Sequence, residues 1–228
     1  MLKFLGTGSC FNVGDGNNAC YYFDKSEQAI LLIDCGESVF ERIVKTGLLD
    51  GIKSIDIMIT HLHSDHAGSL PSLLFFCDLA MGLAPKVIYP DKETIGSYLG
   101  LTGNDARKFE LVCPSEYDRY EIAEIEQEHS KFLKAYGYLI RIGGELLYYS
   151  GDTHTIDPKI LQMLNDGQID HFYQDTTRYE NASHLNIDAL YGLVAAEYRD
   201  RVVCMHLDDE ISREKAKGYG FHVAHNGT

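Results

Sequence analysis

The order of apolar and polar positions predicts strands and helices that alternate along the chain. Short apolar runs rich in β-branched and aromatic residues predict strands, whereas longer runs with apolar residues three and four apart predict helices. Strands are predicted at 2–5, 19–24, 29–34, 55–60, 86–89, 109–113, 120–128, 135–142, 145–150, 170–174 and 201–205, with a final strand near Phe221. Helices are predicted at 37–45, 69–79, 92–99, 158–164 and 187–198, with a short helix from Ser212. No fixed-period repeat or Pro- or Ser-rich linker divides this pattern, which therefore predicts one α/β domain over residues 1–228.

A group of metal-ligand residues stands directly after one predicted strand. Beginning at Thr60, the chain reads Thr-His-Leu-His-Ser-Asp-His-Ala-Gly, which places His61, His63, Asp65 and His66 within six positions. His61 and His63 are expected to leave the strand end on one side, while Asp65 and His66 turn toward the other. This arrangement suits two metal ions better than one. Imidazole and carboxylate ligands favour zinc, with manganese, iron or nickel as alternatives. One isolated histidine would usually be a solvated loop residue, but this spacing predicts a metal site.

Other predicted strands also end in residues that could belong to a site. Asp34 could steer a metal ligand or cap the helix that follows it. Asp152, in a Gly-Asp-Thr turn, could join the site or cap the helix near Pro158. Three further candidates are polar residues near the ends of elements, where α/β sites assemble: Asp175 closes one strand, His184 opens the following helix, and His206 ends another strand. The Gly-Thr-Gly-Ser segment near the N-terminus lacks the rest of a phosphate-binding motif, so it predicts a tight turn beside the site.

The charge and the cysteines narrow the class of protein. Lys and Arg number 20 against 34 Asp and Glu, which gives a formal net charge of −14. Two divalent ions would bring it only to about −10, and no basic run suggests a nucleic-acid groove. The six cysteines have no C-x-x-C spacing, and no signal segment is recognised, so we expect a reducing cytoplasm. No apolar stretch reaches the length of a membrane span, so no membrane partner is expected.

The motifs, taken in chain order, resemble those of one superfamily. The segments TGS, DCG, THLHSDHAG, GDT and MHL, together with His129 and His184, resemble the metallo-β-lactamase superfamily. The H-x-H-x-D-H pattern is specific for the superfamily, while FLGTGS and YSGDT are similar to its ribonuclease Z and small-phosphodiesterase branch. The resemblance covers nearly the whole chain. It implies a four-layer αββα sandwich, in which two mixed sheets pack face to face and metals bind at one edge.

The resemblance also implies a role for each candidate residue. It implies two divalent ions held by seven ligands: His61, His63 and His129 for the first, Asp65, His66 and His206 for the second, and Asp152 as the bridge. Asp65 is also counted among the catalytic residues. His184 is the implied proton donor, and Asp175 is its orienting partner. His222 and His225 are expected to be bystanders, whereas His154 could face the substrate.

These roles predict a metal-dependent hydrolase that cleaves a small phosphodiester, such as a cyclic nucleotide. Ribonuclease Z enzymes commonly insert a tRNA-gripping arm between the third-motif histidine and the bridging aspartate. Here Ser130–Gly151 fill that interval with a predicted hairpin, so precursor tRNA is a poor candidate. The alternative is hydrolysis of a carboxylic ester, lactone or thioester on the same metals, and His184 favours the phosphodiester. A degenerate binding module would lack ligands, and none is missing. The resemblance also suggests a homodimer.

Overall fold

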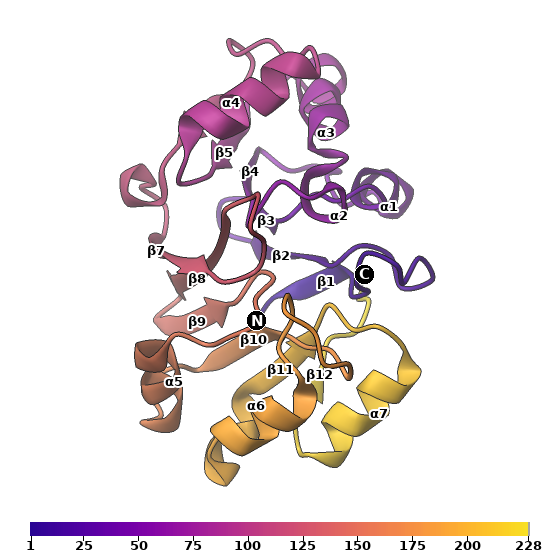
Figure 1. Ribbon diagram of the computed structural model, residues 1–228. Coiled ribbons are helices and arrows are strands. Elements are labelled where there is room, and N and C mark those ends of the chain that lie inside the picture. Colours follow the sequence, from indigo (N-terminus) through magenta and orange to yellow (C-terminus); the bar gives the residue numbers. More distant parts are fainter. Residues whose placement is uncertain (228) are drawn as a thin grey trace.

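The computed structural model describes residues 1–227 and arranges them as two six-stranded sheets that face each other (Figure 1). The first sheet contains, in spatial order, β1 (Lys3–Gly6), β2 (Ala19–Asp24), β3 (Ala29–Ile33), β4 (Ser54–Met58), β5 (Lys86–Ile88) and β6 (Glu110–Val112). The second contains β12 (His222–Val223), β11 (Val202–Met205), β10 (His171–Asp175), β9 (Glu145–Tyr149), β8 (Ala135–Ile142) and β7 (Glu121–Gln127). In the first sheet β1, β2 and β3 pair antiparallel and β3 to β6 parallel. In the second, β9 to β12 pair parallel and β7, β8 and β9 antiparallel.

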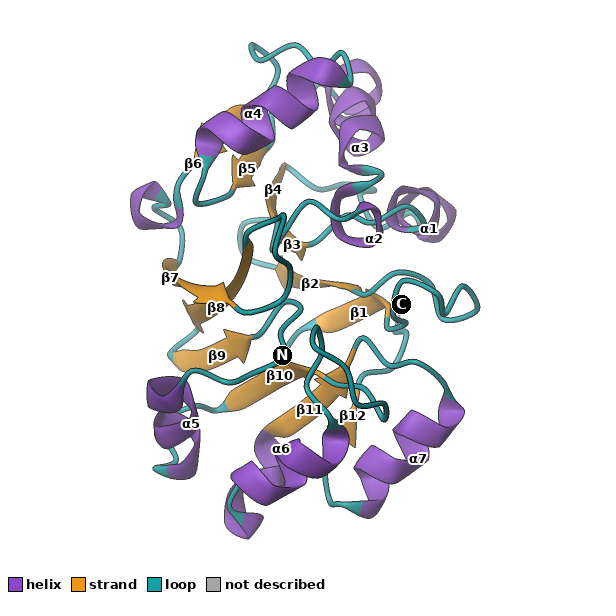
Figure 2. Ribbon diagram, viewed as in Figure 1, coloured by secondary structure: helices purple, strands orange, loops and turns teal. Residues whose placement is uncertain are grey.

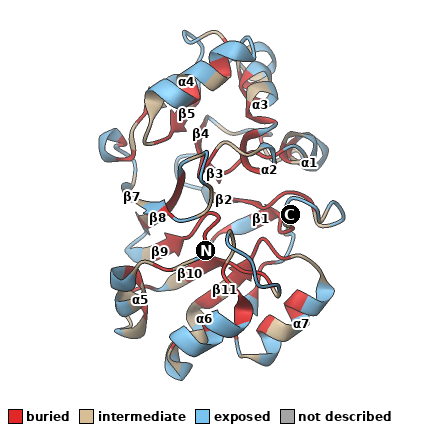
Figure 3. Ribbon diagram, viewed as in Figure 1, coloured by how far each residue is buried: buried red, intermediate tan, exposed pale blue. Residues whose placement is uncertain are grey.

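Helices cover the outer side of each sheet, so the predicted four layers of two mixed sheets and two helical layers are confirmed (Figure 2). The first sheet is covered by α1 (Val39–Thr46), α2 (Ser64–Ala67), α3 (Leu70–Phe76) and α4 (Lys92–Leu101). The second is covered by α5 (Pro158–Asn165), α6 (Ile187–Leu193) and α7 (Glu210–Gly218). Each outer helix buries one stripe and exposes the other, as Figure 3 shows. Among the helices of residues 1–227, none combines the length and the apolar character that crossing a membrane requires.

The core between the sheets contains large tyrosines whose hydroxyl groups find polar partners. Tyr138 on β8 is fully buried, and its hydroxyl donates to the Ile59 carbonyl over 2.7 Å. Tyr149 on β9 is also fully buried, and its hydroxyl accepts from the Asn18 side-chain amide over 2.8 Å. A buried hydroxyl without a partner would be destabilising, so these bonds fix the spacing of the sheets. The first bond also holds the second sheet against the segment that leads into His61.

Two predicted helices differ from the structure. The helix predicted at 187–198 is wrong beyond Leu193, because Val194 is extended and a 3₁₀ segment, Ala196–Arg201, follows. The Asn165 side chain stabilises this break by donating to the Leu193 carbonyl and accepting from the Ala195 amide. The helix predicted at 69–79 is divided into α3 and a π-helical turn, Cys77–Met81, and α2 is an additional turn before it. Another short 3₁₀ turn, Pro114–Glu116, precedes β7.

Candidate metal centre

The candidate site lies at the edge where parallel strands of both sheets end. In the first sheet, Asp34 follows β3 and His61 stands three residues beyond β4. In the second sheet, Asp152 stands three residues beyond β9, and His206 directly follows β11. Carboxyl ends of parallel strands within a sheet point to the same edge, so residues far apart in sequence meet there. The two sheets thereby bring all seven predicted ligands into two adjoining groups.

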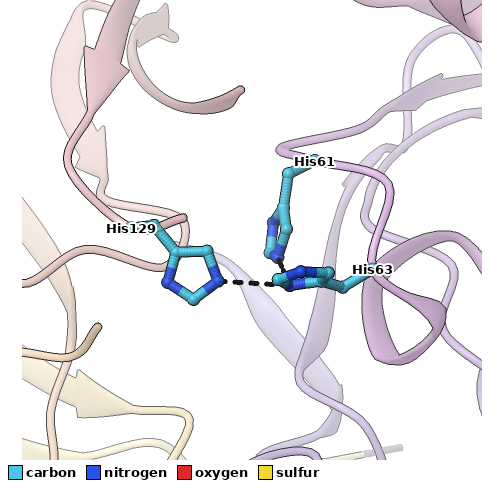
Figure 4. A group of neighbouring side chains, drawn as sticks. All are labelled: His61, His63 and His129. Carbon is cyan, nitrogen blue, oxygen red and sulfur yellow. Dashed lines mark hydrogen bonds between the residues drawn. The ribbon is translucent and has the colours of Figure 1, made fainter. Parts of the chain in front are cut away.

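The first group consists of His61, His63 and His129 (Figure 4). His61 Nε2 lies 3.0 Å from His63 Nδ1, and His129 Nε2 lies 3.2 Å from the same atom. Two ligand atoms bound tetrahedrally at zinc–nitrogen distances of about 2.0–2.1 Å would be about 3.3 Å apart. The spacing of the three nitrogens therefore suits a common cation. Burial lowers the pKa of His61 well below its usual value, which favours the neutral, metal-binding form.

The second group consists of Asp65, His66, Asp152 and His206, all of them buried. Asp65 Oδ2 lies 3.4 Å from both His66 Nε2 and His206 Nε2. Although burial opposes ionisation, His206 and His66 hold the pKa of Asp152 well below its usual range. The charged carboxylate is thus the form that this group stabilises.

Asp152 faces both groups. Its Oδ1 lies 3.3 Å from His66 Nε2, and its Oδ2 lies 3.6 Å from His206 Nε2. The same Oδ2 lies 3.8 Å from both His61 Nε2 and His129 Nε2. One carboxylate therefore adjoins nitrogens of both groups, as a bridging ligand would. The alternative that Asp152 caps the next helix is wrong, because the Asp157 side chain accepts from the first amides of α5.

Unsatisfied buried atoms also indicate that cations fit this site. His66 Nε2 and Asp152 Oδ1 are inaccessible to solvent, and neither makes a hydrogen bond with any residue that the structure describes. Leaving such atoms without partners would cost roughly 1–3 kcal/mol each. A divalent ion beside these two atoms would satisfy both. The donor set of imidazoles and carboxylates is the one that zinc uses in catalytic sites.

His184 and Asp175 form a pair beside the second group. His184 Nδ1 donates to Asp175 Oδ2 over 2.7 Å, and Asp175 is fully buried at the end of β10. The Thr153 amide donates to the same oxygen over 3.0 Å, which fixes the carboxylate. Burial disfavours the charged form of His184, but the Asp175 carboxylate outweighs it and raises the pKa of His184 above its ordinary value. This hydrogen bond occupies Nδ1 and leaves Nε2 available for proton transfer.

A third arrangement of possible ligands overlaps the second. Asp152, Asp175, His184 and His206 also offer ligand atoms within 4.8 Å of one another. Asp175 Oδ1 lies 3.3 Å from His206 Nδ1, so this carboxylate contacts both neighbouring histidines. An ion held by this group would make His184 a ligand. Metal content of a His184 variant separates that role from proton donation.

Asp34 orients one histidine of the second group. It is fully buried, and its Oδ2 accepts from His66 Nδ1 over 2.9 Å. Its Oδ1 accepts from the Thr60 amide over 2.8 Å. A carboxylate that orients a ligand histidine in this way fixes its tautomer and ring position. Of the two roles predicted for Asp34, the structure matches the orienting one, since Ser38 stands at the N-terminus of α1.

We expect Asp34→Asn to lower metal affinity about 10–100-fold, because the neutral amide orients His66 less firmly and weakens its basicity. Competition with a chromogenic chelator measures this affinity. Asp118→Asn is the control, since that exposed carboxylate pairs with Lys86 over 2.8 Å and not with a site residue. Unchanged affinity in Asp34→Asn would restrict Asp34 to holding the Thr60 backbone.

Two glycines permit the backbone to bring these residues together. Gly151 has φ of 59°, and a Cβ there would lie 2.5 Å from the Tyr136 carbonyl. A Cβ on Gly36 would lie 1.9 Å from the Asp65 carbonyl. Each position therefore requires glycine for close approach. Gly151 directly precedes Asp152, so the turn that carries the bridging candidate depends on this conformation.

The exposed side of the groups forms a pocket of about 300 Å³. Its lining includes residues of both groups and His184, together with Cys10, Ser130 and Ser183. The sequence gives no chemical reason to single out these last three, although Cys10 directly follows the predicted Gly-Thr-Gly-Ser turn. That turn does lie beside the site, because the Ser9 amide donates to the Leu207 carbonyl over 3.2 Å. Among the remaining histidines, His154, His222 and His225 have exposed positions and do not line this pocket.

A larger hollow of about 570 Å³ lies away from the metal groups. Asp170 and His171 line it at the start of β10, and Arg201 lines it just before β11. The candidate ligands stand at the opposite ends of these strands. Size alone therefore does not identify the reaction site.

Comparisons with known proteins agree with this geometry. A sequence model of the family described as "Anti-Pycsar protein Apyc1" matches residues 1–96 and 104–227. One such protein, from Paenibacillus xerothermodurans, is 26% identical over 232 residues, covering 93% of this chain and 90% of its own. A UPF0173 metal-dependent hydrolase of Pyrococcus furiosus is 28% identical over 152 residues, covering 60% of this chain and 59% of its own. The structure also resembles YhfI of Bacillus subtilis, a metallo-β-lactamase fold protein, with a TM-score of 0.73 and 15% identity over 98% of this chain and 94% of the other. The predicted metallo-β-lactamase fold is therefore confirmed.

Proposed function

The chain belongs to the Anti-Pycsar protein Apyc1 family and is a metal-dependent hydrolase, and from this premise we propose that it is a dinuclear phosphodiesterase. Its proposed substrate is a small phosphodiester such as a cyclic nucleotide. The observation that carries this proposal is the His184–Asp175 pair at the edge of two metal-ligand groups that share Asp152. Such a pair supplies the proton that a poor leaving group requires.

Seven residues are proposed to hold two divalent ions, most readily zinc, with manganese, iron or nickel as alternatives. His61, His63 and His129 would hold one ion, Asp65, His66 and His206 the other, and Asp152 both. When bound, the ions would lower the pKa of water toward about 7 and polarise a phosphoryl oxygen. The spacing of the nitrogens and the unpartnered atoms of His66 and Asp152 support this assignment.

The chain itself contributes orientation and proton transfer. Cleavage of a phosphodiester expels an alkoxide, which must be protonated as it leaves. His184 lines the pocket, and its Nδ1–H bond to Asp175 holds the ring so that Nε2 can give the proton. Burial alone would disfavour the protonated ring, but the Asp175 carboxylate outweighs it and raises the pKa of His184, which favours the cationic form that holds the proton before transfer. A positioned acid of this kind contributes roughly 10²–10⁴-fold.

The size and charge of the protein favour a small substrate over precursor tRNA. The segment between His129 and Asp152 contains the hairpin of β8 and β9, which belongs to the second sheet and does not project as an arm. The formal net charge of −14 would repel an extended polyanion. A pocket of about 300 Å³ is of the size that small-molecule sites have.

A hydrolysis screen of the metal-loaded protein tests the proposal. We expect cleavage of bis(p-nitrophenyl) phosphate and of at least one cyclic nucleotide, and slower turnover of lactones and thioesters. Protein stripped with a chelator should be inactive and should recover when the ion is restored. Faster cleavage of a lactone or thioester than of any phosphodiester would favour a carbonyl hydrolase that uses the same metal ligands.

A further inference from the structure

Two loops that line the reaction pocket carry almost fully exposed phenylalanines. Cys10 and Ser130 line the pocket; Phe11 follows Cys10 directly, and Phe132 stands two residues beyond Ser130. Their exposed fractions are 92% and 98%, whereas the other exposed phenylalanines of residues 1–227 reach only 40%. A single exposed apolar side chain is ordinary in a soluble protein. The concentration of the two most exposed rings beside one pocket is not explained by packing.

The segment that carries Phe132 is anchored at the candidate metal centre. His129 Nε2 lies 3.2 Å from His63 Nδ1, and His129 Nδ1 lies 3.0 Å from the Ser183 carbonyl. Ala135, at the other end of the segment, begins β8. Because a chain spans at most about 3.6 Å per residue, the Cα of Phe132 lies within about 7 Å of that of Ser130. The phenylalanine therefore stays near the pocket although its ring packs against little of the protein.

The charges around Phe132 distinguish it from Phe11. Lys131 and Lys134 flank Phe132, and both are exposed in a chain with a formal net charge of −14. Lys134 lies 3.8 Å from the exposed Glu126 carboxylate, a contact that holds it only weakly. The neighbours of Phe11 are Cys10 and Asn12, which carry no positive charge. An exposed ring between two lysines combines a stacking surface with attraction for an anion, as in sites for single-stranded nucleic acids.

We propose that Phe132 is a specificity-determining residue that stacks on the base of a nucleotide substrate. Lys131 and Lys134 would attract the anionic phosphodiester toward the pocket. The inference rests on the proposed phosphodiesterase function for the reacting bond, and it adds the side chain that would recognise the planar base of such a substrate. Phe132 takes no part in the chemical step, so it should affect KM and binding more than kcat.

The test compares a 3′,5′-cyclic nucleotide with the same cyclic ribose phosphate bearing a methoxy group in place of the base. In Phe132→Ala we expect KM for the nucleotide to rise about 10-fold, with kcat changed less than about twofold. Activity on the base-free compound should match wild type. Phe132→Tyr should restore nucleotide recognition because it retains the ring. Leu101→Ala is the control, since Leu101 is 90% exposed at the end of α4 and does not line the pocket.

Calorimetric binding of a non-hydrolysable cyclic nucleotide separates this inference from the proposed function. If wild type cleaves neither compound but Phe132→Ala weakens nucleotide binding about 10-fold, stacking stands and the phosphodiesterase proposal fails. Equal changes for both compounds, or no change for the nucleotide, would overturn stacking. Sedimentation of wild type and Phe132→Ala tests whether a second copy of the chain covers the Phe132 ring instead. If the substitution converts a dimer to a monomer and affects both compounds equally, the ring belongs to an interface between copies, and stacking on the base is overturned.

Discussion

Replacement of Asp152 with alanine is expected to reduce bound metal from about two ions per chain to one or fewer, and to lower kcat/KM by about 10³-fold. Asp152 is the only residue whose carboxylate lies within 3.8 Å of nitrogens from both the His61 group and the His66 group, within the part of the chain that the structure describes. Its removal weakens both positions together and leaves His66 Nε2 without its nearest carboxylate oxygen. Elemental analysis of protein purified without chelator measures the metal content.

His222→Ala is the matched control for this experiment. His222 is exposed on β12 and lines the larger hollow, not the pocket beside the ligand groups, so its loss should leave metal content and activity near wild-type levels. Circular dichroism shows whether each variant retains its fold. Wild-type protein that binds a single ion would overturn the dinuclear assignment. Full metal content in Asp152→Ala would restrict the carboxylate to contacts with substrate.

The sequence alone could predict the part of the site that lies in one short segment between a strand and a helix. His61, His63, Asp65 and His66 stand within six positions between a strand and a helix, so local spacing places them together. Their division into two groups also follows from this spacing, because Asp65 and His66 begin a new helical turn at α2. A local pattern is sufficient where local backbone geometry sets the distances.

Local sequence pattern could not predict that His129, Asp152 and His206 lie beside the His61–His66 segment, because only the packing of the two sheets brings them there. Strand ends marked Asp152 and His206 as candidates, but their assignment as ligands, and the choice of His129, depended on resemblance to a family. For Asp152, a local signal could have excluded the capping role: Asp157 immediately precedes Pro158, and its side chain accepts from Lys159 and Ile160. The sequence thus contained a better cap five residues further on.

The remaining differences also come from contacts between distant segments. The helix predicted at 187–198 ends early because Asn165, on another helix, supplies both a donor and an acceptor at the break. The choice between two roles for Asp34 depends on Thr60 and His66, which reach it only after β3 and β4 pair. Hydrophobic periodicity reports which face of an element is buried, but it does not report these side-chain hydrogen bonds.

His184→Ala should retain both metal ions and lose about 10²–10⁴-fold in kcat on a cyclic nucleotide, while losing less than about 10-fold on bis(p-nitrophenyl) phosphate. A ribose hydroxyl is a poor leaving group that needs a proton, whereas nitrophenolate leaves as a stable anion. Asp175→Asn should show a milder form of the same pattern, because the ring loses the charged partner that lies 2.7 Å from its Nδ1. Rates on both substrates and metal content are measured on the same preparations.

The ratio of the two losses decides the role of His184. Equal losses on both substrates would indicate binding or structural support, and unchanged rates would remove His184 from the mechanism. Loss of an ion would instead favour the ligand group of Asp152, Asp175, His184 and His206, whose atoms lie within 4.8 Å of one another. Proton donation requires the selective pattern with metal retained, since a donor acts on the leaving oxygen and a ligand acts on the ion. His184→Gln provides a further check, because an amide can donate a hydrogen bond but cannot transfer a proton, and it should fail on the cyclic nucleotide as alanine does.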